Sequence, residues 1–130
     1  MARSIYNAWT EAHDLSLLYL TLMHGTEQEM GDFEVRMVAA CLEARCPDLD
    51  PISARRILDY VLLIFISKTG RLMLETTIAS LAKSMARPDR LAVVQDLVNI
   101  ASSDGIVMPK EIQFITHVAH EWDVDHELQF

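Results

Sequence analysis

The chain has few of the features that mark specialised classes of protein. Its 130 residues include only two cysteines, Cys41 and Cys46, which lie five positions apart in one expected helix and so point in different directions. We therefore expect no disulfide and a reduced, cytoplasmic protein. The longest uninterrupted apolar run, residues 60–66, is too short to cross a bilayer. The N-terminus also lacks the apolar core of a signal peptide.

Catalytic and nucleic-acid-binding patterns are missing as well. The sequence contains no Gly-rich phosphate loop, no nucleophile elbow and no His-Glu-x-x-His motif, so we expect a protein that is not an enzyme. The basic residues are few, are spread over several segments and lack interleaved aromatic residues, which argues against nucleic-acid binding. A metal-dependent hydrolase would need a pocket that holds Asp104, Glu111 and a histidine together.

Apolar residues make up 51% of the chain and recur at spacings of three and four. This spacing is typical of helices that bury one face, and no segment shows the alternation of a strand. We predict one all-α domain, residues 1–130, with six to seven helices. The expected helices cover residues 5–24, 32–45, 51–66, 71–85, 88–102 and 109–121, with the start of a seventh at 123–130. Residues 57–66 are apolar nearly all round, which favours a central covered helix; the alternative is one half of a dimer interface.

The most informative stretch is the bend between the last two full helices. Asp104-Gly105 followed by Glu111 reproduces the spacing of the second half of an EF-hand loop. Loop positions one and three would fall on Ile100 and Ser102, so a complete calcium loop is excluded and a partial site of oxygen ligands is left.

The same residues also fit helix capping. Pro109 suits the first helical position, which places Glu111 at the third, where its carboxylate can accept exposed backbone N–H groups. Gly105 is expected in the left-handed conformation after a helix end, with Asp104 as a turn former. Both interpretations, capping and metal ligation, stay open for Asp104 and Glu111.

A weak internal repeat supports the second interpretation. A shift of 77 positions lays Glu34 on Glu111 and Glu27 on Asp104, with apolar residues matching apolar residues around them. The pattern predicts two pseudo-repeated helix-turn-helix units around a central apolar helix. Gln28 stands where the second unit has its glycine, and Glu34 can also be explained as a capping residue.

Two helix-turn-helix units, each with an acid before the bend and a Glu opening the next helix, resemble the TerB-like family, named after a tellurite resistance protein. The resemblance runs from about residue 15 to 122 and is most specific at Asp104-Gly105 and Glu111. It implies an all-α fold of about seven helices and an acidic cluster that binds a divalent cation, calcium especially. Carried over to this chain, the metal ligands are Asp104, Glu111, Glu34 and Glu27.

The distribution of charge agrees with such a site. The net charge is −8, and the acids concentrate in residues 1–50 and 91–130, the two parts that carry the repeat. Carboxylates brought together there would repel one another, and Ca²⁺ or Mg²⁺ would relieve that repulsion. Alternatively, solvent and salt screen them over about 8 Å. The more basic middle, residues 51–90, favours an acidic protein partner or proximity to an anionic membrane surface.

Two functional hypotheses follow. In the first, the protein binds a divalent cation at its acidic bends and docks partner proteins in a stress-related assembly of the tellurite-resistance kind. In the second, it keeps the fold without metal and acts in homo- or hetero-oligomerisation, for example as a homodimer. His117 and His120 lie one turn apart and could meet Zn²⁺, but they also suit the negative end of their helix dipole.

Overall fold

The computed structural model describes residues 9–24, 32–66, 69–103, 105 and 107–125. The described residues form six helices and no strand, so the predicted all-α class is confirmed. The helices are α1 (Glu11–His24), α2 (Asp32–Arg45), α3 (Pro51–Ile66), α4 (Thr69–Ser84), α5 (Arg87–Ala101) and α6 (Pro109–Glu121). The expected residues 5–8 of the first helix and 126–130 of a seventh lie outside the described part of the chain.

The helix starts follow from local chemistry. At α3, the backbone N–H of Ser53 donates to Asp50 Oδ1 at 2.7 Å, which makes Asp50 the N-cap ahead of Pro51. This hydrogen bond lowers the pKa of Asp50. Helix α6 begins at Pro109, whose missing N–H costs nothing at a first helical position. The observed bounds of α2, α3 and α6 therefore match the predicted ones.

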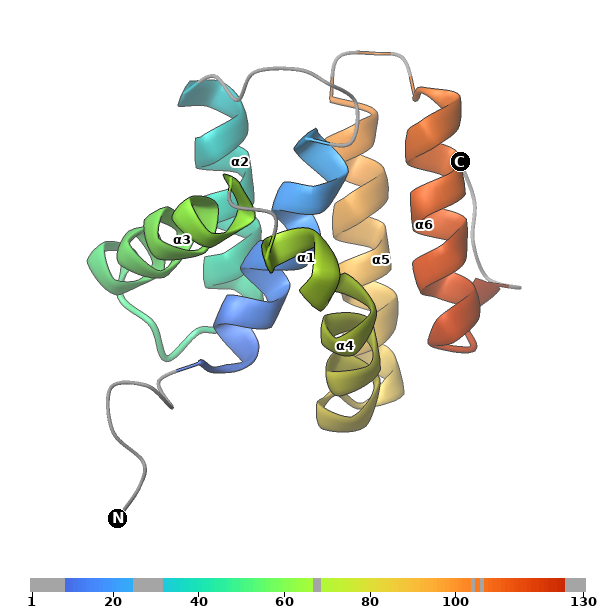
Figure 1. The fold of residues 1–130 in the computed structure, drawn as a ribbon, viewed down its shortest axis with the longest axis horizontal. Helices are drawn as coiled ribbons and strands as arrows, with labels where there is room; N and C mark the ends of the chain where they lie inside the picture. The colour runs from blue at the N-terminus through green and yellow to red at the C-terminus, as the bar shows by residue number, and fades with distance from the viewer. Residues whose placement is uncertain (1–8, 25–31, 67–68, 104, 106, 126–130) are drawn as a thin grey trace.

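Helix α1 is the central helix of the fold and contacts each of the other five helices (Figure 1). It is buried all round from Ala12 to Leu20. Two of its hydroxyl side chains, one buried and one partly buried, bond to carbonyls of the same helix. Ser16 Oγ donates to the carbonyl of Ala12 at 2.8 Å, and Thr21 Oγ1 donates to that of Leu17 at 2.7 Å. Because these hydroxyls bond within the helix, they can lie among the apolar side chains of α1 without a partner from another helix.

The expectation that residues 57–66 form the central helix is wrong. Helix α3 packs mainly on three helices, α1, α2 and α4, and it lies on the outside of the bundle (Figure 1). Its Leu58 and Val61 are buried, but Ile52, Tyr60 and Leu63 are exposed. The central apolar helix exists, but α1 fills that position. Its buried polar side chains have partners: Ser16 bonds within the helix, whereas Asp14 accepts the Thr77 hydroxyl of α4 and Tyr19 donates to Asp96 of α5.

The predicted repeat is visible in the helix bounds. A shift of 77 carries the end of α1 at His24 onto the end of α5 at Ala101, and the start of α2 at Asp32 onto the start of α6 at Pro109. Contacts also match: α2 packs on α5 and α1 packs on α6. In Figure 1, α1 and α5 run upward and α2 and α6 run downward. The two helical hairpins are thus related by an approximate twofold axis.

In the part of the chain that the structure describes, no helix has both the length and the apolar composition needed to cross a membrane.

Candidate functional site

The two hairpins bring four helix ends to one end of the molecule. The ends of α1 and α5 and the starts of α2 and α6 all lie at the top in Figure 1. These are the helix ends that flank the two acidic bends. Of the predicted ligands, Glu27 and Asp104 lie outside the described residues. Glu34 is the third residue of α2, equivalent by the repeat to Glu111, and its side chain is outside the described part as well.

Glu111 is the predicted ligand whose side chain the structure describes. It is the third residue of α6 and is only 9% exposed. Its Oε1 accepts the backbone N–H of Met108 at 2.8 Å, which is the capping interaction expected from sequence. This hydrogen bond holds the start of α6 and fixes the Glu111 carboxylate at that helix end.

The bend itself has the predicted backbone geometry. Gly105 has φ 89°, in the left-handed region that an L side chain rarely adopts. Its N–H donates to the carbonyl of Ser102 at 2.9 Å. The hydroxyls of Ser102 and Ser103 donate to the carbonyls of Val98 and Ile100, both at 2.8 Å. The backbone N–H groups of Ser102 and Ser103 donate to the same two carbonyls, so each hydroxyl adds a second hydrogen bond at the end of α5.

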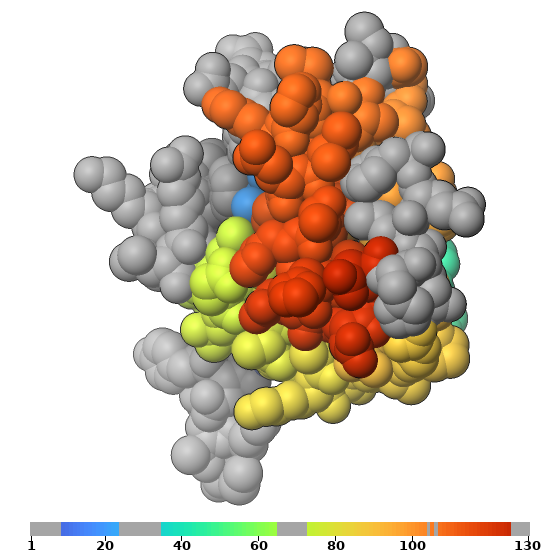
Figure 2. Space-filling view, turned by 90° about the vertical axis from the view of Figure 1, so that its right-hand side faces the viewer, coloured from blue at the N-terminus to red at the C-terminus, as the bar shows by residue number. Residues whose placement is uncertain are grey.

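The histidines of α6 do not converge on a common point. His117 Nε2 lies 3.0 Å from Glu75 Oε1 on α4, whereas His120 Nδ1 lies 3.4 Å from Asp125 Oδ2. Figure 2 shows this face of the molecule, with α6 bordered by α4. Among the described side chains, no group of three or more His, Cys, Asp or Glu residues could hold a metal ion. The geometry gives no support to a zinc site on α6.

A buried polar network that sequence reasoning missed joins the two hairpins. Tyr19 donates its hydroxyl to Asp96 Oδ2 at 2.7 Å, and Arg45 Nε lies 3.2 Å from the same oxygen. Burial raises the pKa of Asp96, while the Tyr19 hydrogen bond and the Arg45 charge oppose that shift. Burial and the Asp96 carboxylate both raise the pKa of Tyr19.

One signal could have predicted this contact. Tyr19 and Asp96 are 77 positions apart, which is the shift of the repeat. The repeat aligns them as equivalent positions of α1 and α5, two helices that contact each other. The contact holds α1 against α5 and so fixes the ends of these two helices relative to each other.

The cysteines are structural in character. Cys41 and Cys46 are both free and partly buried. Burial raises the pKa of the Cys41 thiol to about 11, with the Asp96 carboxylate adding to the shift, and burial also raises the pKa of Cys46. Thiols with raised pKa values are poor nucleophiles at neutral pH.

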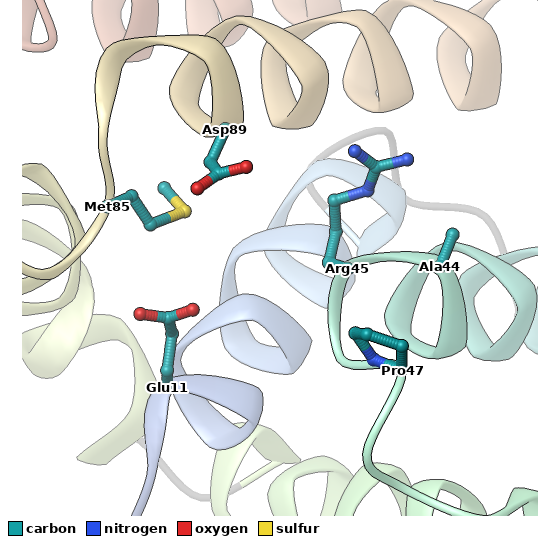
Figure 3. Close-up of a pocket in the computed structure, with 6 residues that line it drawn as sticks. All are labelled: Glu11, Ala44, Arg45, Pro47, Met85 and Asp89. Carbon is teal, nitrogen blue, oxygen red and sulfur yellow. The ribbon is translucent and has the colours of Figure 1, made fainter.

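A pocket of about 230 Å³ lies at the end of the molecule opposite the helix ends that flank the acidic bends, and Figure 3 shows its lining residues. It opens between the first turns of α1 and α5 and the last turn of α2, and it is smaller than usual ligand pockets. Figure 3 shows the carboxylates of Glu11 and Asp89 facing the opening, with Arg45 beside them. The lining residues are Glu11, Ala44, Arg45, Pro47, Met85 and Asp89. None of these described lining residues is a predicted ligand of the candidate site.

Comparison with protein families supports the resemblance seen in the sequence. Residues 23–128 match the family model TerB, whose description is tellurite resistance protein TerB. Comparisons with curated proteins and with solved structures returned no match. The family match covers both acidic bends and five of the six described helices in full. With its two helical hairpins and its Asp-Gly bend followed by a capping Glu, the chain belongs to the TerB family.

Proposed function

We propose that the protein is a non-enzymatic helical module that binds one divalent cation, Ca²⁺ or Mg²⁺, at its acidic end and docks a protein partner there, in a tellurite-resistance or stress context. The observation that carries this proposal is the common location of the four helix ends that flank the acidic bends (Figure 1). Two bends at one end of a rigid bundle can supply ligands to a single ion.

The chemistry of the acids supports a hard cation. Carboxylate oxygens are the preferred ligands of Ca²⁺ and Mg²⁺, and several carboxylates held close together gain from neutralisation. The proposed ligands are Asp104 and Glu111 from the second bend, with Glu34 and Glu27 from the first. The hydrogen bond from the Met108 N–H holds the Glu111 carboxylate at the start of α6, next to the second bend.

Calorimetric titration of metal-stripped protein with Ca²⁺ and with Mg²⁺ tests the proposal. Glu111→Gln is the appropriate variant because its amide oxygen can still accept the Met108 N–H while the charge is lost. We expect saturable binding to the native protein and at least a tenfold weaker affinity for Glu111→Gln, Asp104→Asn and Glu34→Gln.

Glu121→Gln is the matched control, since it makes the same change at the exposed far end of α6. It should bind the cation as the native protein does. Absence of binding heat up to millimolar cation would contradict the proposal, as would an equal loss of affinity in Glu121→Gln.

A second candidate is the family fold used without metal for oligomerisation. It is favoured by the exposure of Ile52, Tyr60 and Leu63 on α3, because large apolar side chains gathered on one helix face are typical of a contact surface. Association that persists in a chelator would favour this candidate, whereas association that requires the cation would favour the first.

A further inference from the structure

The outer face of α3 carries three large apolar side chains in solvent. Ile52 is 68% exposed, Tyr60 is 53% exposed and Leu63 is 71% exposed. They lie eight and three positions apart, so they fall along one side of the helix. The ring of Tyr60 is supported from behind by an edge contact with the ring of His13, 6.0 Å between centroids. This contact links Tyr60 to α1.

Charged residues fill the centre of the same face. Arg55, Arg56 and Asp59 are all exposed, and Arg55 Nε lies 3.0 Å from Asp59 Oδ1. The apolar residues Ile52 and Leu63 thus stand at the two ends of a stripe with basic residues nearer its start and an acid nearer its end.

When two copies of α3 are placed side by side in opposite directions, the residues along this stripe face residues of complementary character. An antiparallel pairing about the midpoint between Ile57 and Leu58 places Ile52 opposite Leu63 of a second copy. The same pairing places Arg56 opposite Asp59, and Arg55 opposite Tyr60. The contacts are apolar against apolar, cation against anion, and guanidinium against an aromatic ring. Each contact occurs twice because a twofold interface uses the same surface on both copies.

We propose that this face of α3 docks on the α3 face of a second copy of the chain in the antiparallel register, forming a homodimer. The charge pattern selects this occupant and orientation, since a parallel pairing would place Arg56 against Arg56 and Asp59 against Asp59. Helix α3 lies in the least acidic part of a chain of net charge −8, where repulsion between two copies is smallest. The dimer does not depend on the proposed cation site.

The size of this α3 face sets the affinity that we expect for the dimer. A helix of 16 residues is about 24 Å long, so the contact lies at the small end of specific interfaces. We expect a reversible dimer that dissociates on dilution within the micromolar range. We also expect it to weaken as salt is added, because the central ion pairs are solvent-accessible.

Sedimentation equilibrium of the full chain over a range of concentrations tests the dimer. Leu63→Glu should weaken association at least tenfold. Ile112→Glu, which adds the same charge at an exposed apolar position on α6, should leave association unchanged. Circular dichroism melts confirm that each variant is folded. A native chain that is monomeric at all concentrations overturns the proposal, and so does equal disruption by Ile112→Glu.

A charge exchange tests the register. Arg56→Glu alone places two acids opposite each other, and Asp59→Arg alone places two cations opposite each other, so each variant should associate at least tenfold more weakly than the native chain. The double variant, with both changes in one chain, should associate as the native chain does. Failure of the double variant to recover association, with both single variants folded, overturns the antiparallel register.

Discussion

At the scale of single residues, His13 shows how this fold uses a buried polar group. The side chain is 8% exposed, and its Nδ1 accepts the backbone N–H of Thr10 at 3.0 Å. A ring nitrogen that accepts a hydrogen bond carries no proton, so the folded state favours the neutral imidazole. Burial lowers the pKa of His13 below 6.5, while the neighbouring Asp14 opposes the shift.

The direction of this shift predicts a pH dependence of stability. The unfolded chain takes up a proton at His13 near pH 6.5, whereas the folded chain resists protonation until a lower pH. The stability contributed by neutral His13 is therefore present above about pH 7 and is lost as pH falls through about 6.5 towards the folded pKa. Urea unfolding at pH 7.5 and at pH 5.5 should show lower stability at the lower pH.

Two variants test whether His13 causes this pH dependence of stability. His13→Asn keeps a side-chain acceptor for the Thr10 N–H but cannot be protonated, so the pH-dependent loss should be smaller in this variant than in the native chain. His120→Gln is the control, because His120 is exposed and near Asp125. A full pH-dependent loss that remains in His13→Asn would assign the effect to other groups.

At the scale of helices, the contrast between α1 and α3 shows what could and could not be predicted from sequence. Prolines and N-caps predicted the bounds of α2, α3 and α6. The apolar spacing predicted that α1 and α3 are helices. It did not predict which one is central, because burial depends on neighbours that are distant in sequence. Ser16 in α1 is buried, and its hydroxyl bonds to a carbonyl of its own helix.

Two leucine truncations test the corrected assignment. Leu18 on α1 is fully buried, so Leu18→Ala should lower the free energy of unfolding by about 2–5 kcal/mol. Leu63→Ala on α3 should change it by less than about 0.5 kcal/mol in dilute solution, where chains are monomeric. Urea denaturation measures both values. A larger loss in Leu63→Ala than in Leu18→Ala would restore α3 as the central helix.

At the scale of the whole molecule, the repeat connects sequence, fold and site. The shift of 77 was weak as a sequence signal because few aligned residues are identical. It is clear in the helix bounds and in the Tyr19–Asp96 contact between equivalent positions. The candidate site was predictable only in part. The capping geometry of Glu111 and the left-handed Gly105 followed from local pattern, whereas the packing that brings the four flanking helix ends together at one end of the molecule depends on the tertiary fold.

The claim that one cation joins the two bends makes a direct prediction for nuclear magnetic resonance. Backbone amide signals should be followed in metal-stripped, ¹⁵N-labelled protein as Ca²⁺ is added. Signals from the end of α5 and the start of α6 should shift together with those from the end of α1 and the start of α2, all with one dissociation constant. Signals at the opposite end, near Glu11 and Asp89, should stay unchanged. Shifts confined to one bend, or spread evenly over the molecule, would contradict a single shared site.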